Sequence, residues 1–212
     1  MDARSLIPAD ADLVALRVAA ADCQACPLHA DATQTVFGTG DPAASVVLVG
    51  EQPGDVEDQR GLPFVGPAGK LLQKAVAEAG FGQGAVYVTN AVKHFRFEQR
   101  GKRRIHQTPG PEHIRACSPW LAAELALVEP EVVVCLGATA VKALLGSAYR
   151  VTKDRGVLLP FDDLPGAEAL ITTHPSAILR MPPETREDGY TGLVADLRVA
   201  AEAVGQRGRG ST

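Results

Sequence analysis

Short apolar runs alternate with longer stretches of helical spacing along most of the chain. The apolar runs are rich in β-branched residues, which predicts strands at residues 45–49, 86–92, 131–136, 157–161 and 169–172. The intervening stretches predict helices at residues 12–21, 69–79, 111–128, 138–145 and 187–204. Strands that alternate with helices indicate an α/β fold, in which helices cover both faces of a parallel sheet.

A single domain accounts for residues 1–204, because 212 residues with 46% hydrophobic composition can bury one substantial core. The remaining segment, residues 205–212 (GQRGRGST), lacks core-forming residues and is predicted to be disordered. No apolar run approaches the roughly 20 residues that cross a bilayer, and the N-terminus lacks the pattern of a secretory signal. We therefore expect a cytoplasmic protein without a membrane partner, and nothing in the sequence requires more than a monomer.

Positive charge is concentrated in one segment of an acidic chain. The formal net charge is −4, which argues against a protein that coats nucleic acid with its whole surface. Between residues 93 and 106, however, a single anion, Glu98, accompanies six cations: Lys93, Arg96, Arg100, Lys102, Arg103 and Arg104. This excess of cations is typical either of a solvated loop or of a segment that contacts DNA phosphates.

Polar or turn-forming residues follow three of the predicted strands. The segments are residues 50–54 (GEQPG), 89–90 (TN) and 174–176 (HPS). Because the carboxyl ends of parallel strands meet at one edge of a sheet, we expect these segments to form one crevice. The Pro-Gly pair of the first segment predicts a tight turn whose rim presents Glu51, Gln52 and Asp55. Phe64, in a loop rich in Gly and Pro, is either a core residue or a platform on which a base stacks.

The spacing of the four cysteines indicates a metal site rather than a disulfide framework. Cys23 and Cys26 form a CxxC pair, and Cys117 adds a third soft ligand suited to an iron–sulfur cluster or to zinc. Cys135 lies within the apolar run EVVVCLG, where a free cysteine usually acts as a small hydrophobic residue.

Four segments, together with the upstream CxxC pair, resemble the uracil-DNA glycosylase superfamily, and they are closest to its iron–sulfur (family four) branch. They are GEQPGDVED, GLPFVGPAGKLL, VYVTNAVK and THPSAILR, in that order along the chain. The resemblance implies the fold of that superfamily, a three-layer α/β/α domain with a central, mainly parallel four-stranded sheet. It also implies an enzyme that cleaves the N-glycosidic bond of uracil in single-stranded or double-stranded DNA.

The resemblance assigns roles to individual residues of these segments. It implies that Asn90 reads the edge of uracil, that Phe64 stacks on the ring and that His174 donates a hydrogen bond to the departing base. Gln52 and Asp55 are placed in the uracil pocket, with a purely structural role at the rim as the alternative for both. Ser176 is expected to contact the DNA.

The loop GKRRIHQTP, residues 101–109, resembles the extra loop of the UdgX proteins, a subgroup that excises uracil and then bonds covalently to the DNA sugar. On this resemblance His106 is the nucleophile, and Glu51 orients and deprotonates it. The flanking cations Lys102, Arg103 and Arg104 are expected to bind DNA. A neutral imidazole is a competent nucleophile, which agrees with this assignment. A histidine that merely contacts phosphate is the alternative.

A 4Fe–4S cluster is implied by the resemblance, with one departure from the usual ligands. The family-four pattern has a cysteine after the second strand, where this chain has His94, in agreement with the UdgX subgroup. The predicted ligands are therefore Cys23, Cys26, His94 and Cys117. The alternatives for the fourth position are His29, His113 and Cys135, and zinc would satisfy the same residues.

Three other functions are compatible with parts of the sequence. The first is a conventional glycosylase with multiple turnovers, in which Glu51 activates water and His106 only contacts DNA. The second is an iron–sulfur DNA-binding module or redox sensor without catalysis, although binding alone does not require Glu51, Asn90 and His174 together. The third is an enzyme acting on a small nucleotide, which leaves the basic segment without a purpose.

Overall fold

The computed structural model describes residues 2–82 and 84–207. Its central sheet has six strands in the order β1-β3-β2-β6-β8-β7. Their bounds are β1 Thr39–Gly40, β2 Val46–Gly50, β3 Val86–Asn90, β6 Val132–Leu136, β7 Leu158–Pro160 and β8 Glu168–Thr172. The four inner strands are parallel, and β1 and β7 pair antiparallel at the two edges. The predicted parallel core of four strands is confirmed, and an antiparallel edge strand extends it on each side.

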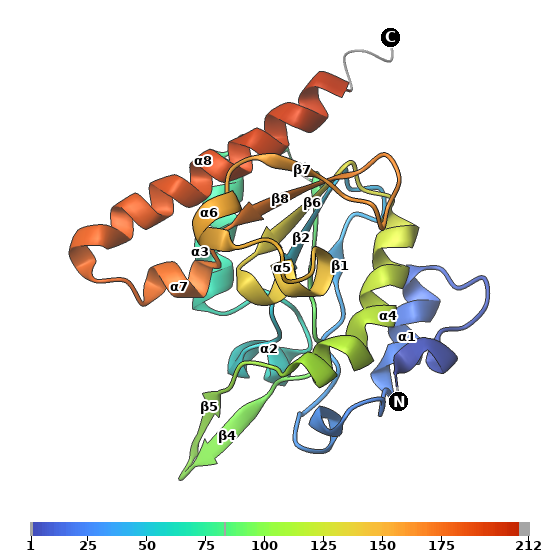
Figure 1. Ribbon diagram of the computed structural model, residues 1–212. Helices are drawn as coiled ribbons and strands as arrows, with labels where there is room; N and C mark the ends of the chain where they lie inside the picture. Colours follow the sequence, from blue (N-terminus) through green and yellow to red (C-terminus); the bar gives the residue numbers. More distant parts are fainter. Residues whose placement is uncertain (1, 83, 208–212) are drawn as a thin grey trace.

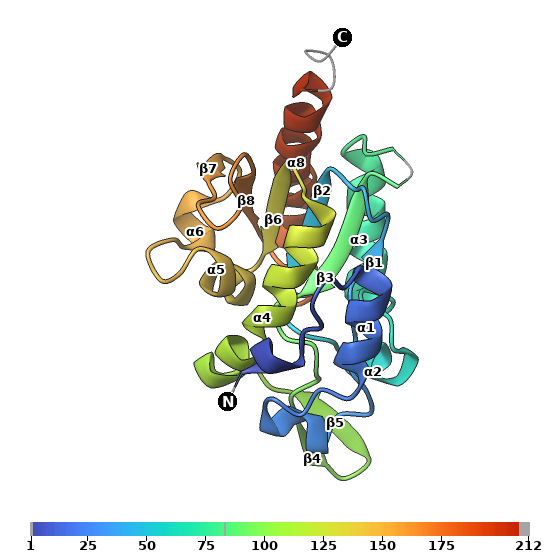
Figure 2. The ribbon, with the colours of Figure 1, turned by 90° about the vertical axis from the view of Figure 1, so that its right-hand side faces the viewer.

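Helices cover both faces of this sheet, so the three-layer architecture is also confirmed (Figures 1 and 2). The α-helices are α1 Leu13–Ala21, α2 Asp55–Arg60, α3 Pro67–Glu78, α4 Pro111–Val128, α5 Ala138–Leu144, α6 Val151–Asp154, α7 Pro175–Leu179 and α8 Pro183–Arg207. Two 3-10 helices, η1 Ala3–Leu6 and η2 Pro27–Ala30, lie near the N-terminus. In the part of the chain that the structure describes, no helix is both long and apolar enough to span a membrane.

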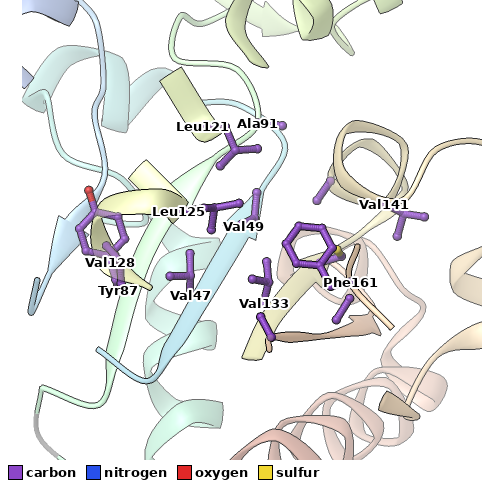
Figure 3. Packing of buried hydrophobic residues seen from close by; sticks show 14 of the residues in the cluster. Val47, Val49, Tyr87, Ala91, Leu121, Leu125, Val128, Val133, Val141 and Phe161 are labelled. Carbon is purple, nitrogen blue, oxygen red and sulfur yellow. The ribbon is translucent and has the colours of Figure 1, made fainter. Parts of the chain in front are cut away.

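Alternation of side chains along the strands divides the interior into two cores. Val47 and Val49 of β2 face α4 and α5, whereas Val46 and Leu48 face α3, α7 and α8. Figure 3 shows the first core, where Leu121 and Leu125 of α4 lie near β2. Because both faces are covered, the inner strands are apolar throughout, as expected for a parallel sheet.

Cys135 belongs to the first of these cores and is fully buried in β6. The other three cysteines lie in a third apolar cluster, where α1 and η1 pack on α4. The sequence-based interpretation of Cys135 as a buried apolar residue of a strand is therefore confirmed.

A β-hairpin replaces the loop that was expected at the basic segment. Strands β4 (Phe97–Arg100) and β5 (Arg103–His106) pair antiparallel and project beyond the sheet (Figure 1). A two-residue turn joins them, and its first residue, Gly101, has a φ of 59°, a conformation that glycine adopts without strain. The strands were not predicted because their charged residues hide any alternation of apolar and polar positions.

Helices α2, α6 and α7 were not predicted, and α8 is longer than the predicted helix. The predicted rim after Gly54 continues as α2, for which Gly54 is the N-cap. Helix α8 begins at Pro183, before the predicted start, and continues to Arg207, beyond the predicted end of the domain at residue 204. Of the tail that was predicted to be disordered, residues 208–212 lie outside the described part of the chain.

Candidate active site and cysteine cluster

A cavity of about 780 Å³ lies at the carboxyl ends of the parallel strands. All four strands contribute to it, through residues at or just after their last positions. Among its lining residues are seven of the predicted site residues: Glu51, Gln52, Phe64, Asn90, His106, His174 and Ser176. The predicted convergence of three segments on one crevice is confirmed. The lining does not include Asp55, Lys102, Arg103 or Arg104.

Gly50 allows Phe64 and Asn90 to meet at the end of β2. A Cβ atom at residue 50 would lie 2.6 Å from Cζ of Phe64 and would also overlap Oδ1 of Asn90. Phe64 has a φ of 54°, in the left-handed region that residues other than glycine rarely adopt. Backbone conformations of this kind persist where the surrounding structure enforces them, often at functional sites. The surrounding structure therefore fixes Phe64 as part of the cavity wall.

His174 lines the cavity, and its surroundings favour the neutral form of its ring. Its Nδ1 accepts a hydrogen bond from the main-chain N–H of Ser176, at 3.1 Å. Burial is the main cause that lowers the pKa of His174 to about 4, with smaller contributions from Arg180 and from His106 when that ring is protonated. Because a neutral imidazole that accepts at Nδ1 carries its proton on Nε2, His174 offers an Nε2–H donor. Its ring lies 6.2 Å from that of Phe64, centroid to centroid.

His106 faces a carboxylate that a third side chain orients. Its Nε2 lies 3.3 Å from Oε1 of Glu51, while the hydroxyl of Thr139 donates to Oε2 of the same carboxylate. Burial lowers the pKa of His106, and the positive charge of Arg180 acts in the same direction against the opposing effect of Glu51. A neutral imidazole beside a carboxylate is the arrangement of an activated nucleophile or of a base. Sequence analysis did not identify Thr139, which follows the carboxyl end of β6.

Gln52 closes the base of the hairpin that carries His106. Its side-chain Nε2 donates to the carbonyl oxygens of Arg96 and Gln107, at 3.0 and 3.1 Å. Its Oε1 accepts from the main-chain N–H of Arg96 at 3.1 Å. The amide group is thus engaged with the backbone on both sides of the hairpin. Gln52 lines the cavity, but its side chain positions the hairpin rather than offering free hydrogen-bonding groups to a base.

Arg104 binds the hairpin to α2. Its guanidinium donates to Asp55 at 2.5 Å and to Asp58 at 2.6 Å, with 17% of the side chain exposed, and it lies over the rings of Phe95 and Phe97. Its hydrogen-bonding capacity is therefore largely used within the protein, unlike the phosphate contact expected of it. Asp55 likewise belongs to this structural contact and not to the cavity wall.

Carboxylates pair with part of the positive charge of residues 93–106. Lys93 is buried and forms an ion pair with Glu124, and Arg100 pairs with Glu98 at 3.0 Å. Lys102 and Arg103, at the hairpin turn, are exposed. Of the cations expected to face DNA, these two are the ones whose side chains remain directed to solvent.

Cys23, Cys26 and Cys117 are buried in the third apolar cluster together with Trp120. The indole N–H of Trp120 donates to Sγ of Cys23, and the main-chain N–H of Lys93 donates to Sγ of Cys117, each at 3.2 Å. Burial raises the pKa of the Cys117 thiol to about 12. N–H groups directed at sulfur are typical of the surroundings of thiolate ligands in iron–sulfur proteins.

The candidates for a fourth ligand differ in their surroundings. His94 is buried, with its pKa lowered to about 4 mainly by burial, and its Nε2 lies 2.9 Å from the hydroxyl of Thr35. His113 instead caps α4, because its Nδ1 accepts from the N–H of Gly110. Nδ1 of His29 lies 2.7 Å from the carbonyl oxygen of Cys26.

Three buried thiols and one buried imidazole are a donor set that suits an iron–sulfur cluster. Among residues 2–82 and 84–207, no three His, Cys, Asp or Glu side chains have the arrangement of a site for a metal ion. The three thiols, two of which accept N–H groups, nevertheless fit the chemistry of the expected cluster, and His94 directly follows Lys93, whose main-chain N–H donates to Cys117.

Comparison with known proteins decides the family. A model of the uracil DNA glycosylase superfamily matches residues 37–198, most of the chain. The chain belongs to this superfamily. The matched region includes the whole cavity together with His94 and Cys117, whereas Cys23 and Cys26 precede it.

Individual members of the superfamily are similar over most of their length. A type-4 uracil-DNA glycosylase of Thermotoga maritima is 41% identical over 159 residues, which cover 74% of this chain and 78% of the relative. A type-4 uracil-DNA glycosylase of Pyrobaculum aerophilum is 34% identical over 182 residues, which cover 81% and 86% of the two chains. Similarity to type-4 proteins agrees with the expected iron–sulfur branch.

Proposed function

We propose that this protein excises uracil from DNA and then bonds covalently to the deoxyribose through His106. The observation that carries the proposal is the distance of 3.3 Å between Nε2 of His106 and Glu51, in the wall of the cavity that also contains Asn90 and His174. Similarity to proteins named type-4 uracil-DNA glycosylase supports the excision step. The likeness of residues 101–109 to the UdgX loop supports the covalent step.

Recognition of uracil depends on Asn90 and Phe64. A base inside a duplex is not accessible, so the uridine is extruded into the cavity or taken from single-stranded DNA. The carboxamide of Asn90 offers a donor and an acceptor, which match the O4 and N3–H groups of uracil. Cytosine presents the reverse pattern at these atoms and is rejected. The ring of Phe64 provides the surface on which the base stacks.

Cleavage separates charge, and the cavity stabilises both parts. The C1′–N1 bond breaks, its electron pair leaves with uracil, and the sugar becomes an oxocarbenium ion. His174 donates its Nε2–H to a carbonyl oxygen of the departing uracil anion, a preorganised form of electrostatic catalysis. The carboxylate of Glu51, next to His106, stabilises the positive charge that develops on the sugar.

Capture follows at the same carbon atom. Glu51 accepts the proton from Nε2 of His106. The electron pair left on Nε2 then forms the bond to C1′ of the sugar. The products are free uracil and a DNA strand attached to the protein, so a second turnover does not occur. Gln52 and Arg104 assist indirectly because they hold the hairpin in place.

A 4Fe–4S cluster held by Cys23, Cys26, His94 and Cys117 accompanies this activity in our proposal. When bound, it cross-links the N-terminal segment to α4 and to the segment after β3, and it supplies no step of the reaction. Iron and sulfide content of the purified protein tests it. We expect Cys117→Ser to lose both, while Cys135→Ser, a matched change at a buried cysteine outside the cluster, keeps them.

Covalent capture is tested by mixing the protein with an oligonucleotide that contains one uridine and analysing the boiled mixture on a denaturing gel. We expect a band at the summed mass, which His106→Ala abolishes and Lys102→Ala retains at saturating DNA. Free abasic product with many turnovers would contradict the role of His106 but not excision. Absence of both products, with iron content intact, would indicate a binding module instead.

A further inference from the structure

A second, smaller cavity of about 370 Å³ adjoins the active-site cavity. Ala138 at the start of α5 and Val151 at the start of α6 line both cavities. The segment that connects these helices forms part of the lining of the second cavity. In both ribbon views this segment is well separated from the β4–β5 hairpin (Figures 1 and 2), so the two elements border the active site on different sides.

Two cationic side chains and one aromatic side chain are among the residues that line the second cavity. Lys142, Tyr149 and Arg150 line it, and both cations are exposed. Within residues 2–82 and 84–207, neither cation forms an ion pair with a carboxylate. The nearby acid Asp154 accepts the main-chain N–H of Arg150 at 2.7 Å as a helix-capping contact. On a chain of net charge −4, two unpaired cations beside the active site form a local anion-binding surface.

We propose that this cavity binds the nucleotide next to the excised uridine on the same DNA strand. Its phosphate lies between Lys142 and Arg150, and its sugar and base lie against the half-buried ring of Tyr149. Aromatic rings and cations combine in this way where proteins follow a single strand without reading its sequence. This inference rests on the proposed function, because a strand must first place its uridine in the active-site cavity.

The salt dependence of DNA binding tests the two cations. The probe is a single-stranded oligonucleotide with one internal 2′-fluoro-deoxyuridine, whose fluorine disfavours the positive sugar and so prevents excision during the measurement. We expect Lys142→Ala/Arg150→Ala to raise Kd and to reduce the slope of log K against log salt by about 0.7, the value for one neutralised phosphate on a single strand. Lys142→Glu/Arg150→Glu should raise Kd further.

Lys74→Ala/Arg198→Ala is the matched control. This variant also removes two positive charges, one from α3 and one from α8. Both helices cover the opposite face of the sheet, and both residues are exposed. We expect its Kd and slope to equal those of the unaltered protein. An equal loss in both double variants would mean that overall charge is responsible and would overturn the subsite.

The position of the subsite is tested with two further oligonucleotides, in which the modified uridine stands at the 5′ end or at the 3′ end. The double variant should bind one of them as well as the unaltered protein does, because that strand lacks the nucleotide which the subsite holds. An effect of equal size on both would overturn the proposal. If the unaltered protein excises uracil from ordinary DNA but the double variant binds normally, only the subsite is wrong. If the unaltered protein excises nothing, both proposals fail.

Discussion

The ammonium group of Lys93 and the carboxylate of Glu124 form an ion pair inside the protein, with exposed side-chain fractions of 1% and 0%. Glu124 also accepts from Tyr87, Thr89 and the main-chain N–H of Gly38. Lys93 donates in addition to the carbonyl oxygen of Asn90, at 2.9 Å. The pair therefore connects α4 with the end of β3, where the proposed uracil-reading residue lies.

Removal of one partner should destabilise the protein strongly. We expect Lys93→Met to lower the free energy of unfolding by about 3–5 kcal/mol, because the Glu124 carboxylate is left buried without its counter-charge. Denaturant unfolding measures the effect. Lys93→Met/Glu124→Leu should recover much of the loss, since no buried charge remains in the double variant. A Lys93→Met protein as stable as the unaltered one would mean that the ammonium is not required at this position.

Gly50 should tolerate no side chain. We expect Gly50→Ala to reduce the rate of uracil release by about 100-fold, because the added methyl group displaces Phe64 and Asn90 from the positions they take at the end of β2. Single-turnover release of uracil measures this. Gly82→Ala is the control, since a Cβ atom at residue 82 meets no atom within 4 Å. Normal release by Gly50→Ala would contradict the tight packing at this strand end.

Thr139 should act through Glu51. Its hydroxyl donates to the carboxylate oxygen that does not face His106, so Thr139→Ala leaves that carboxylate free to turn. We expect adduct formation to slow by about tenfold, a loss typical of one hydrogen bond to a charged group. Thr139→Ser retains the hydroxyl and should restore the rate. If Ala and Ser variants react alike, the hydroxyl has no positioning role.

The rate of uracil release should not follow an ordinary histidine titration. Because the pKa of His174 is lowered to about 4, the neutral ring with its Nε2–H donor persists throughout the range above pH 5. Protonation near pH 4 removes the Nδ1 acceptor that Ser176 requires, so the contribution of His174 falls there. Release measured between pH 4 and pH 8 should therefore lack an inflection near 6.5. An inflection at that value, absent in His174→Asn, would contradict the buried neutral ring.

The same shift affects stability in a defined pH window. The folded-state pKa of His174 lies below its ordinary value of 6.5, so the unfolded chain binds the proton first as pH falls. Stability from the neutral ring is complete above about 6.5 and is lost as pH falls towards 4. We expect the thermal midpoint of His174→Asn to decline less over this window than that of the unaltered protein. A parallel decline would mean that His174 titrates normally in the fold.

Local sequence patterns determined much of the architecture and of the cavity. Apolar runs such as residues 45–49 and 131–136 produce buried parallel strands wherever they pack, because side-chain alternation and burial are local properties. The rule that strand ends share one edge then brought Glu51, Asn90 and His174 together. The CxxC spacing likewise indicated that Cys23 and Cys26 act as a pair, and the fold brings the distant Cys117 into the same apolar cluster.

Only the tertiary structure decided which charges are available. The sequence alone does not distinguish the cations of this segment from one another. In the fold, Lys93 pairs with a carboxylate of α4 and Arg104 with carboxylates of α2. Lys102 and Arg103 face solvent. The hydroxyl of Thr139 reaches Glu51 across 88 positions of the chain. Such contacts depend on which distant segments meet in the fold, and neither periodicity nor a short motif records that. Charge and motif indicated the kind of chemistry, and packing selected the side chains that remain free to perform it.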